Sequence, residues 1–181
     1  MYADIKYLEL LKFKGCEDCV ECCKKPMAPL VLEDFEKVYN YFPIMIAKLD
    51  QLKPVMLLSN DTSCPYLINS RCSVYDKRPP ACKIYPYSPW YDSILLDLSC
   101  NAVGTEGEKL PLTQEEFKKS AFYEERFENI NSKLHKTEKW INRIQKKYYK
   151  TYFGIDLFFI EGDDIFSEYA KTSLIHINKY F

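Results

Sequence analysis

The stretch that decides the fold is Cys16-Glu17-Asp18-Cys19-Val20-Glu21-Cys22-Cys23, which places four thiols within eight residues. Two residues between cysteines allow a turn to aim both sulfurs at one centre, with backbone amides free to donate hydrogen bonds to them. Thiolate is the form of cysteine that ligates metals, and it suits Zn²⁺ and iron–sulfur clusters. Three cysteines at this spacing are closest to the ferredoxin-type run, because structural zinc sites usually show two paired knuckles.

Outward from this run, the remaining cysteines occur singly, at Cys64, Cys72, Cys82 and Cys100. Eight thiolates divide naturally into two sets of four. We hypothesise that the first three cysteines of the run share one set with a distant cysteine, and that Cys23 joins three others. Adjacent side chains diverge by about 100° on a helix and about 180° on a strand. Cys22 and Cys23 are therefore expected to serve two neighbouring centres, or one of them is expected to bind no metal.

We expect a globular protein of the cytosol. It has 181 residues, 47% of them hydrophobic and 15% aromatic, enough for a core without disulfide staples. We see no signal peptide after Met1, and no apolar stretch approaches the roughly 18 residues of a membrane span. Because cytosolic thiols stay reduced unless a metal binds them, metal ligation is favoured over disulfides or free thiols.

The distribution of cysteine and proline predicts the domain organisation. All eight cysteines lie between Cys16 and Cys100, and all ten prolines lie between Pro26 and Pro111. We expect a cysteine-cluster metal-binding domain over residues 1–110 and a helical extension over residues 111–181, packed on it as one compact unit. The expected fold class is α+β and rich in helix, with an irregular cysteine-rich core, short strands and C-terminal helices.

The hydrophobic pattern predicts the individual elements. Short strands are expected at 27–32, 55–59, 66–68 and 91–98, and short helices at 5–13, 33–41, 44–52 and 78–83. Thr113 and Glu116 form a capping box. The apolar stripe that follows, from Phe117 to Tyr148, has acidic residues at its start and basic ones at its end, which complements a helix dipole. It predicts a long helix, with Gly154 ending it or its successor, and a last helix over about 163–178.

These cysteines resemble the signature of the CxxCxxCC cysteine-cluster family, whose domains are described as chelating zinc or iron. Cys64-Pro-Tyr-Leu67 is similar to its Cys-Pro-aromatic-Leu element. Cys72-Ser-Val-Tyr75, Arg78-Pro79 and Cys82-x2-Tyr85-Pro86 together resemble its Cys-x2-Tyr, Arg-Pro and Cys-x2-aromatic-Pro block. Cys100-Asn-Ala-Val-Gly104 resembles a Cys-Pro-Gly-x-Gly element in which Asn101 and Ala102 replace Pro-Gly. The resemblance covers about residues 16–107.

The expected cofactor is an iron–sulfur cluster, as one or two [4Fe–4S] centres, with zinc as the alternative. All eight cysteines are candidate ligands. Arg78 is a candidate to offset the charge of about −2 on a four-thiolate site and to donate hydrogen bonds to it. An ion pair between Arg78 and Asp76, or another carboxylate, is an equal alternative. His135 and His176 are expected to be solvated helix positions, and the basic run 133–150 a solvated helix face.

The sequence is compatible with three functions. The first is an iron–sulfur protein in a redox or accessory role, and the second is a zinc-binding interaction module without catalysis. The third is a methyl-transfer enzyme, implied only by the related cysteine pattern of flagellin lysine methylases. No phosphate loop, nucleophile elbow or His-Glu-x-x-His motif identifies a substrate, so enzymatic activity is left open. We expect a protein partner and no membrane contact, and the net charge of −1 disfavours nucleic acid.

Overall fold

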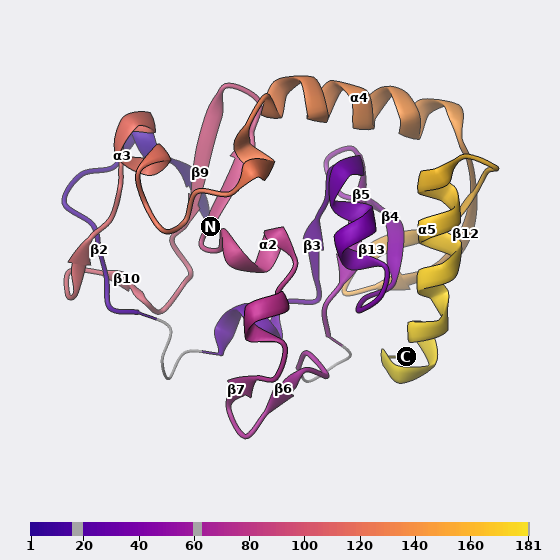
Figure 1. Ribbon diagram of the computed structural model, residues 1–181, viewed down its shortest axis with the longest axis horizontal. Coiled ribbons are helices and arrows are strands. Elements are labelled where there is room, and N and C mark those ends of the chain that lie inside the picture. Colours follow the sequence, from indigo (N-terminus) through magenta and orange to yellow (C-terminus); the bar gives the residue numbers. More distant parts are fainter. Residues whose placement is uncertain (16–19, 60–62, 181) are drawn as a thin grey trace. The chain divides into compact units, whose positions relative to one another are not determined.

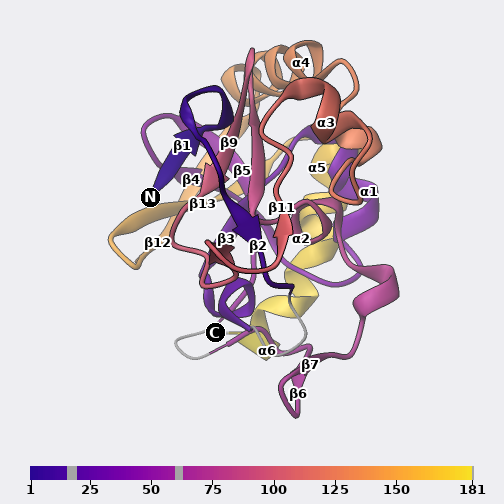
Figure 2. The same cartoon turned by 90° about the vertical axis from the view of Figure 1, so that its left-hand side faces the viewer.

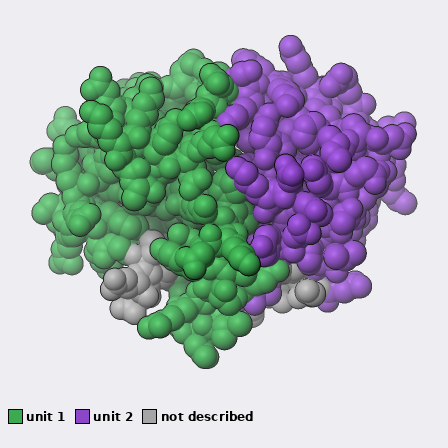
Figure 3. Space-filling model, in the orientation of Figure 1, with its two compact units in different colours: residues 1–23, 66–131 green, residues 24–65, 132–181 purple. Residues whose placement is uncertain are grey.

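The computed structural model describes residues 1–15, 20–59 and 63–180, and the chain divides into two compact units (Figures 1 and 3). Unit 1 comprises Met1–Cys23 and Tyr66–Asn131, and unit 2 comprises Lys24–Pro65 and Ser132–Phe181. The chain therefore leaves unit 1 after the cysteine run and builds the first part of unit 2. It then returns to unit 1 at Tyr66 and enters unit 2 a second time at Ser132. The boundary expected between residues 110 and 111 lies inside unit 1 and stays a prediction, as does the packing of the two parts.

Unit 2 is built on a five-stranded antiparallel sheet in the order β12-β13-β4-β5-β3. Its strands are β3 (Met27–Pro29), β4 (Ile44–Lys48), β5 (Leu52–Leu57), β12 (Gln145–Tyr152) and β13 (Ile155–Glu161). β4 begins Ile-Met-Ile-Ala, and all four residues are buried. Such a continuous apolar run suits a strand covered on both faces. Met45, Val55 and Leu157 form part of the core on one face of this sheet.

Helices accompany this sheet: α1 (Phe35–Val38), α4 (Ile130–Arg143), α5 (Ile165–Ser173) and α6 (Ile177–Tyr180). α5 lies against β13 and β4 (Figure 1), and the backbone N–H of Ile44 donates to Ser173 Oγ at 2.8 Å. The buried ring of Phe35 meets Trp140 of α4 and Phe166 of α5 edge to face. One aromatic centre thus joins three helices. Within the described residues, no helix is long and apolar enough to cross a membrane.

Unit 1 combines two small antiparallel sheets, a hairpin and short helices. One sheet has the order β1-β9-β8 and the other β10-β2-β11, while β6 pairs with β7 (Figure 2). The strands are β1 (Tyr2–Asp4), β2 (Lys12–Phe13), β6 (Leu67–Ile68), β7 (Arg71–Cys72), β8 (Tyr87–Trp90), β9 (Ser93–Asp97), β10 (Val103–Gly104) and β11 (Glu108–Lys109). The α-helices are α2 (Pro80–Lys83) and α3 (Gln114–Lys118), and 3-10 helices occur at Ile5–Tyr7, Glu21–Lys24, Tyr75–Lys77 and Glu125–Phe127. Tyr87, Leu96 and Phe117 lie at the centre of its core.

Most of the short predicted elements are confirmed. The strands expected at 27–32, 55–59, 66–68 and 91–98 overlap β3, β5, β6 and β9, and the turn at 78–83 is α2. The capping box is present at α3, where the Glu116 N–H donates to Thr113 Oγ1 and the Thr113 N–H donates to Glu116 Oε2, both at 3.2 Å. The mixed α+β class is also confirmed. The chain is 33% helical and 30% strand, and the irregular cysteine-rich metal core stays a prediction.

The prediction of one long helix from Phe117 to Tyr148 is wrong. Its apolar stripe runs instead through α3, the 3-10 helix Glu125–Phe127, α4 and β12. Residues 145–161 form the β12–β13 hairpin, in which Phe153 and Gly154 both have positive φ, at 50° and 74°. Positive φ at both central residues is the signature of the two-residue turn that joins antiparallel strands. Gly154 therefore turns a hairpin rather than ending a helix, and the basic run divides between α4 and β12.

The predictions of two shorter helices are also wrong. Residues 44–52 form β4 and the start of β5 instead of a helix. The short apolar run Ile-Met-Ile-Ala is compatible with a buried strand and with a buried helix, so its pattern does not distinguish them. Residues 5–13 keep only one 3-10 turn, Ile5–Tyr7, before the chain reaches β2. Leu10 lies between them with a φ of 56°, which a continuing helix cannot contain.

Candidate metal centre

Cys22 and Cys23 lie on the 3-10 helix Glu21–Lys24, and their Sγ atoms are 4.0 Å apart. The backbone N–H of Cys23 donates to the carbonyl of Val20 at 2.9 Å, which closes this tight turn. Both thiols are partly exposed. The expected divergence of the two side chains is therefore wrong, because the turn brings the two sulfurs together. Cys16 and Cys19 lie outside the described residues.

Cys72 is carried by the β6–β7 hairpin. Asn69 and Ser70 form the two-residue turn, with φ values of 48° and 59°. Beyond Cys72, both the N–H and the hydroxyl of Ser73 donate to the carbonyl of Tyr66, at 2.8 and 3.0 Å. The strand that carries the Cys72 thiol is thereby fixed at both ends.

Cys82 is carried by the short helix α2. Proline at the first helical position is favourable there, because its ring fixes φ and its missing N–H has no helical partner. Pro80 holds this position. The N–H of Cys82 then donates to the carbonyl of Pro79 at 2.9 Å. The Pro-Pro pair thus sets the direction in which the chain presents the Cys82 thiol.

Neighbouring thiols affect the pKa of Cys82 and of Cys22. Burial, and then the charges of Cys22, Cys23 and Cys72, raise the pKa of Cys82 to about 12. The hydrogen bond with Cys23, followed by burial and the charge of Cys23, raises the pKa of Cys22 above its ordinary value. We call Cys22, Cys23, Cys72 and Cys82 the thiol cluster. A metal ion bound beside Cys22 and Cys82 would lower the pKa of both, because a nearby positive charge favours the thiolate.

Arg78 lies between the hairpin and α2. Its Nε donates to the carbonyl of Tyr75 at 3.0 Å, and its guanidinium carbon lies 3.7 Å from the centre of the Tyr75 ring. Its positive charge opposes the rise in the pKa of both Cys22 and Cys82. Among the described residues, no carboxylate forms an ion pair with Arg78, so the alternative of an ion pair with Asp76 is not seen.

Cys100 lies in a different polar environment of unit 1. It is 2% exposed, and the Tyr85 hydroxyl hydrogen-bonds both to it and to Asp97 Oδ2, the latter at 3.2 Å. The fully buried Asp97 carboxylate also accepts from the N–H and the hydroxyl of Ser99, at 3.0 and 2.6 Å. Burial, followed by the charges of Cys100 and Asp97, raises the pKa of Tyr85. Cys64 belongs to unit 2, where it is buried.

The sequence model of a family described as "CxxCxxCC: Putative zinc- or iron-chelating domain" matches residues 15–123. The chain belongs to the CxxCxxCC family. Membership supports a metal-binding role for the protein. The matched residues include all eight cysteines and extend beyond the 16–107 that the sequence resemblance covered. Comparison with curated proteins and with solved structures found no match.

The donor set of this CxxCxxCC protein fits the metals of its family. Soft thiolate ligands select zinc and iron–sulfur centres, and the thiol cluster supplies a close pair, Cys22 and Cys23, with Cys72 and Cys82 near enough for their charges to be felt. Within the described ranges, no three His, Cys, Asp or Glu side chains are close enough to hold a metal ion together. The assignment of all eight cysteines as ligands therefore stays a prediction.

Sequence reasoning named Tyr75 and Tyr85 only as parts of the motifs and did not predict that they contact Arg78 and Cys100. A signal was available for Tyr75, because it stands three residues before Arg78 and steps of three meet on one side of a 3-10 turn. No short spacing links Tyr85 to Cys100. The two histidines behave differently from each other. His135 is exposed and lies 3.8 Å from Glu138, as a solvated position would. His176 is only 5% exposed, so the expectation that it is solvated is wrong.

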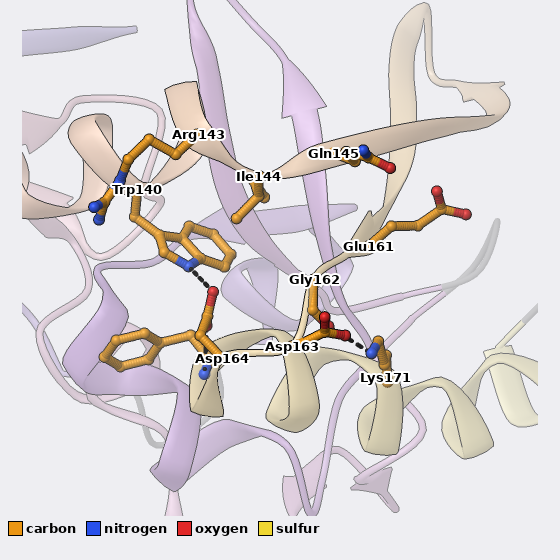
Figure 4. Close-up of a pocket in the computed structure, with 10 residues that line it drawn as sticks. Trp140, Arg143, Ile144, Gln145, Glu161, Gly162, Asp163, Asp164 and Lys171 are labelled. Atoms are coloured by element: carbon orange, nitrogen blue, oxygen red, sulfur yellow. Dashed lines mark hydrogen bonds between the residues drawn. The ribbon is translucent and has the colours of Figure 1, made fainter.

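A cleft of about 810 Å³ lies in unit 2, outside the matched residues (Figure 4). Trp140 Nε1 donates to Asp164 Oδ2 at 2.9 Å, and Asp164 also caps α5 by accepting from the N–H groups of Phe166 and Ser167. Lys171 Nζ donates to the carbonyl of Gly162 and to Glu168. These polar groups serve the local structure of the unit, and no predicted site residue lines the cleft.

Proposed function

We propose that this protein binds a metal ion through the thiolates of unit 1, with a mononuclear tetrahedral zinc centre that includes both Cys22 and Cys23. The observation that carries the proposal is the 4.0 Å separation of their two Sγ atoms. Zn–S bonds of about 2.3 Å in a tetrahedron place neighbouring sulfurs about 3.8 Å apart. The pair therefore needs little movement to share one ion.

Three features support completion of this centre within unit 1. Cys72 and Cys82 are held by short, turn-stabilised elements, and the charge of Cys72 acts on Cys82. Arg78 supplies a positive charge beside the thiols. A structural zinc site closed by four thiolates contributes folding energy and leaves no open position for a substrate. The function that follows is a metal-stabilised interaction module.

An iron–sulfur cluster in a redox or accessory role is the second candidate. The spacing of Cys16, Cys19 and Cys22 favours it, because a ferredoxin-type run has the same two-residue intervals. Each iron of a four-iron cluster takes one thiolate, so the ligand sulfurs stand farther apart than around a single ion. In this arrangement Cys22 and Cys23 would serve different centres, or one of them would bind no metal.

Anaerobic purification, metal analysis and assay of acid-labile sulfide separate the two candidates. The mononuclear proposal expects a colourless protein that contains zinc and no labile sulfide. Replacing the zinc by Co²⁺ should give the intense visible bands of a tetrahedral thiolate complex. A brown protein with labile sulfide would establish the iron–sulfur alternative instead. Protein that takes up no metal under any of these conditions would contradict both.

A further inference from the structure

Helix α4 and the start of β12 concentrate the basic residues of the chain. Residues 131–150 contain seven of its 25 Lys and Arg residues but only one of its 26 Asp and Glu residues, Glu138. The Glu138 carboxylate lies 3.8 Å from His135 Nδ1. The rest of the chain therefore has an acidic excess, although the net charge of the whole chain is −1. A local excess of positive charge on a nearly neutral protein attracts an anionic partner.

Three of these cations lie along one face of α4, and we call Lys136, Lys139 and Arg143 the basic stripe. They stand three and four residues apart, which puts them on the same side of a helix, and all three are exposed. Lys136 pairs with Glu33 at 2.9 Å. Within the described ranges 1–15, 20–59 and 63–180, no carboxylate forms an ion pair with Lys139 or Arg143.

A different lysine stabilises the end of α4. Cations near a helix C-terminus commonly bind its last carbonyl groups, which have no partner inside the helix. Lys146 does so here, because its Nζ donates to the carbonyls of Ile141 and Ile144, at 2.6 and 2.9 Å. Lys139 and Arg143 make no such bond to any residue that the structure describes. Their charges are therefore available to a partner.

The cleft of about 810 Å³ borders the basic stripe, because Arg143 lines it (Figure 4). Its lining also includes the apolar side chains of Ile144 and Phe166. Lys136 Nζ lies 5.4 Å from the centre of the Phe166 ring, so the same ring borders both the cleft and the stripe. Pockets of this size bind small molecules and single side chains. The stripe and the cleft thus form one surface, with cations beside an apolar hollow.

Glu161 and Asp163 restrict what this surface can bind. Both are exposed and line the cleft, and Figure 4 shows Arg143 and Glu161 on opposite sides of Ile144. A long nucleic acid or an anionic membrane is negative over its whole length, so it would meet these carboxylates as well as the acidic remainder of the chain. A short segment can place its negative charges on α4 alone, which gives it the better electrostatic complementarity.

We infer that the basic stripe and the cleft bind a short acidic peptide segment of a partner protein. The carboxylates of that segment lie on Lys139 and Arg143, and one of its apolar side chains enters the cleft beside Ile144 and Phe166. This surface belongs to unit 2 and contains no cysteine, so the inference goes beyond metal binding. It also follows residue 123, where the match to the family model ends.

The test measures binding of a fluorescent peptide, made of glutamates interrupted by leucines, to the full-length protein by anisotropy at low salt. The wild type should bind this peptide. The double variant Lys139→Gln/Arg143→Gln should bind it about 3- to 10-fold more weakly, because two exposed ion pairs are lost. The matched control Lys118→Gln/Lys119→Gln removes the same charge from exposed positions of unit 1 and should stay within about twofold of the wild type. A peptide with serine in place of leucine should bind the wild type more weakly, since it buries less apolar surface.

Four results would overturn the inference. The first is a wild-type protein that does not bind the leucine-containing peptide, and the second is an equal loss of affinity in the two double variants. The third is equal affinity for the serine and leucine peptides, which would exclude the cleft from the site. The fourth is tighter binding of a single-stranded oligonucleotide, or of phosphatidylglycerol vesicles, than of the peptide, since the stripe would then recognise an extended polyanion.

Discussion

Cys22 and Cys23 are adjacent residues whose sulfurs nearly touch, and that contact has a direct consequence for metal binding. If both ligate one ion, Cys22→Ser and Cys23→Ser should each remove most of the bound metal, because a three-thiolate remainder holds it poorly. Metal content per chain after dialysis is the measurement. If one of the two variants keeps its full metal content, the shared centre is wrong and the separate roles expected from the sequence are restored.

Tyr85 carries a second residue-scale prediction. Its hydroxyl donates to the fully buried Asp97 and hydrogen-bonds to Cys100. Tyr85→Phe leaves the buried Asp97 carboxylate short of a donor, which costs about 1–3 kcal/mol of unfolding free energy. Urea unfolding measures the loss. Tyr7→Phe is the control, since Tyr7 is 77% exposed and should change stability by less than about 0.5 kcal/mol.

Among the elements, the small β10-β2-β11 sheet depends on one glycine. Gly107 has φ +97°, and a Cβ added there would lie 2.2 Å from the carbonyl oxygen of Phe13. Where alanine fits, a Gly→Ala change raises the free energy of unfolding by about 0.4–1 kcal/mol. Gly107→Ala should instead lower it, by more than about 1 kcal/mol. Gly104→Ala is the matched control in the same sheet, because nothing lies within 4 Å of its added Cβ. Equal thermal unfolding midpoints for the two variants would refute this view of the turn.

Helix α5 carries a prediction about pH. Burial raises the pKa of Asp164, but hydrogen bonds from the Ser167 N–H, Trp140 and the Phe166 N–H outweigh it and hold that pKa below its ordinary value. A carboxyl whose pKa is lower in the folded state stabilises the fold. This contribution is fully present at pH values above the unfolded-state pKa of about 3.9, and it is lost as the pH falls through the folded-state pKa.

Asp164→Ala should therefore destabilise the protein by about 0.5–2 kcal/mol at neutral pH. It should also flatten the fall in stability below about pH 4. Chemical unfolding at several pH values gives both quantities. Asp163→Asn, at the exposed neighbouring position, is the control and should change stability at neutral pH by less than about 0.5 kcal/mol. A steep acid fall that survives Asp164→Ala would show that other carboxylates cause it.

For the whole molecule, the two units differ in what stabilises them. Unit 2 is built on a five-stranded sheet, whereas unit 1 has smaller sheets and short helices and contains the thiol cluster. Because metal binding couples to folding, chelation should loosen unit 1 first. Limited proteolysis of the metal-loaded protein with and without chelator should show new cleavage within residues 66–131 before 132–180. Early cleavage in unit 2 alone would contradict this dependence.

Local chemistry made part of this structure predictable. Thr113 and Glu116 form a reciprocal cap and Pro80 starts α2, both from contacts between near neighbours in the chain. The β12–β13 hairpin was not predictable in this way. A bulge between Tyr148 and Lys150 interrupts its alternation, and the remaining spacing of three or four matches a helix.

The sequence by itself determined the family of the chain and the local caps and turns, because each depends on residue type and short spacing. Only the tertiary structure decided that two adjacent thiols converge, that Arg78 stacks on Tyr75, and that Cys100 lies with Tyr85 and Asp97. Those results depend on side-chain directions in irregular turns. No periodicity encodes such directions, and they arise when distant segments pack together.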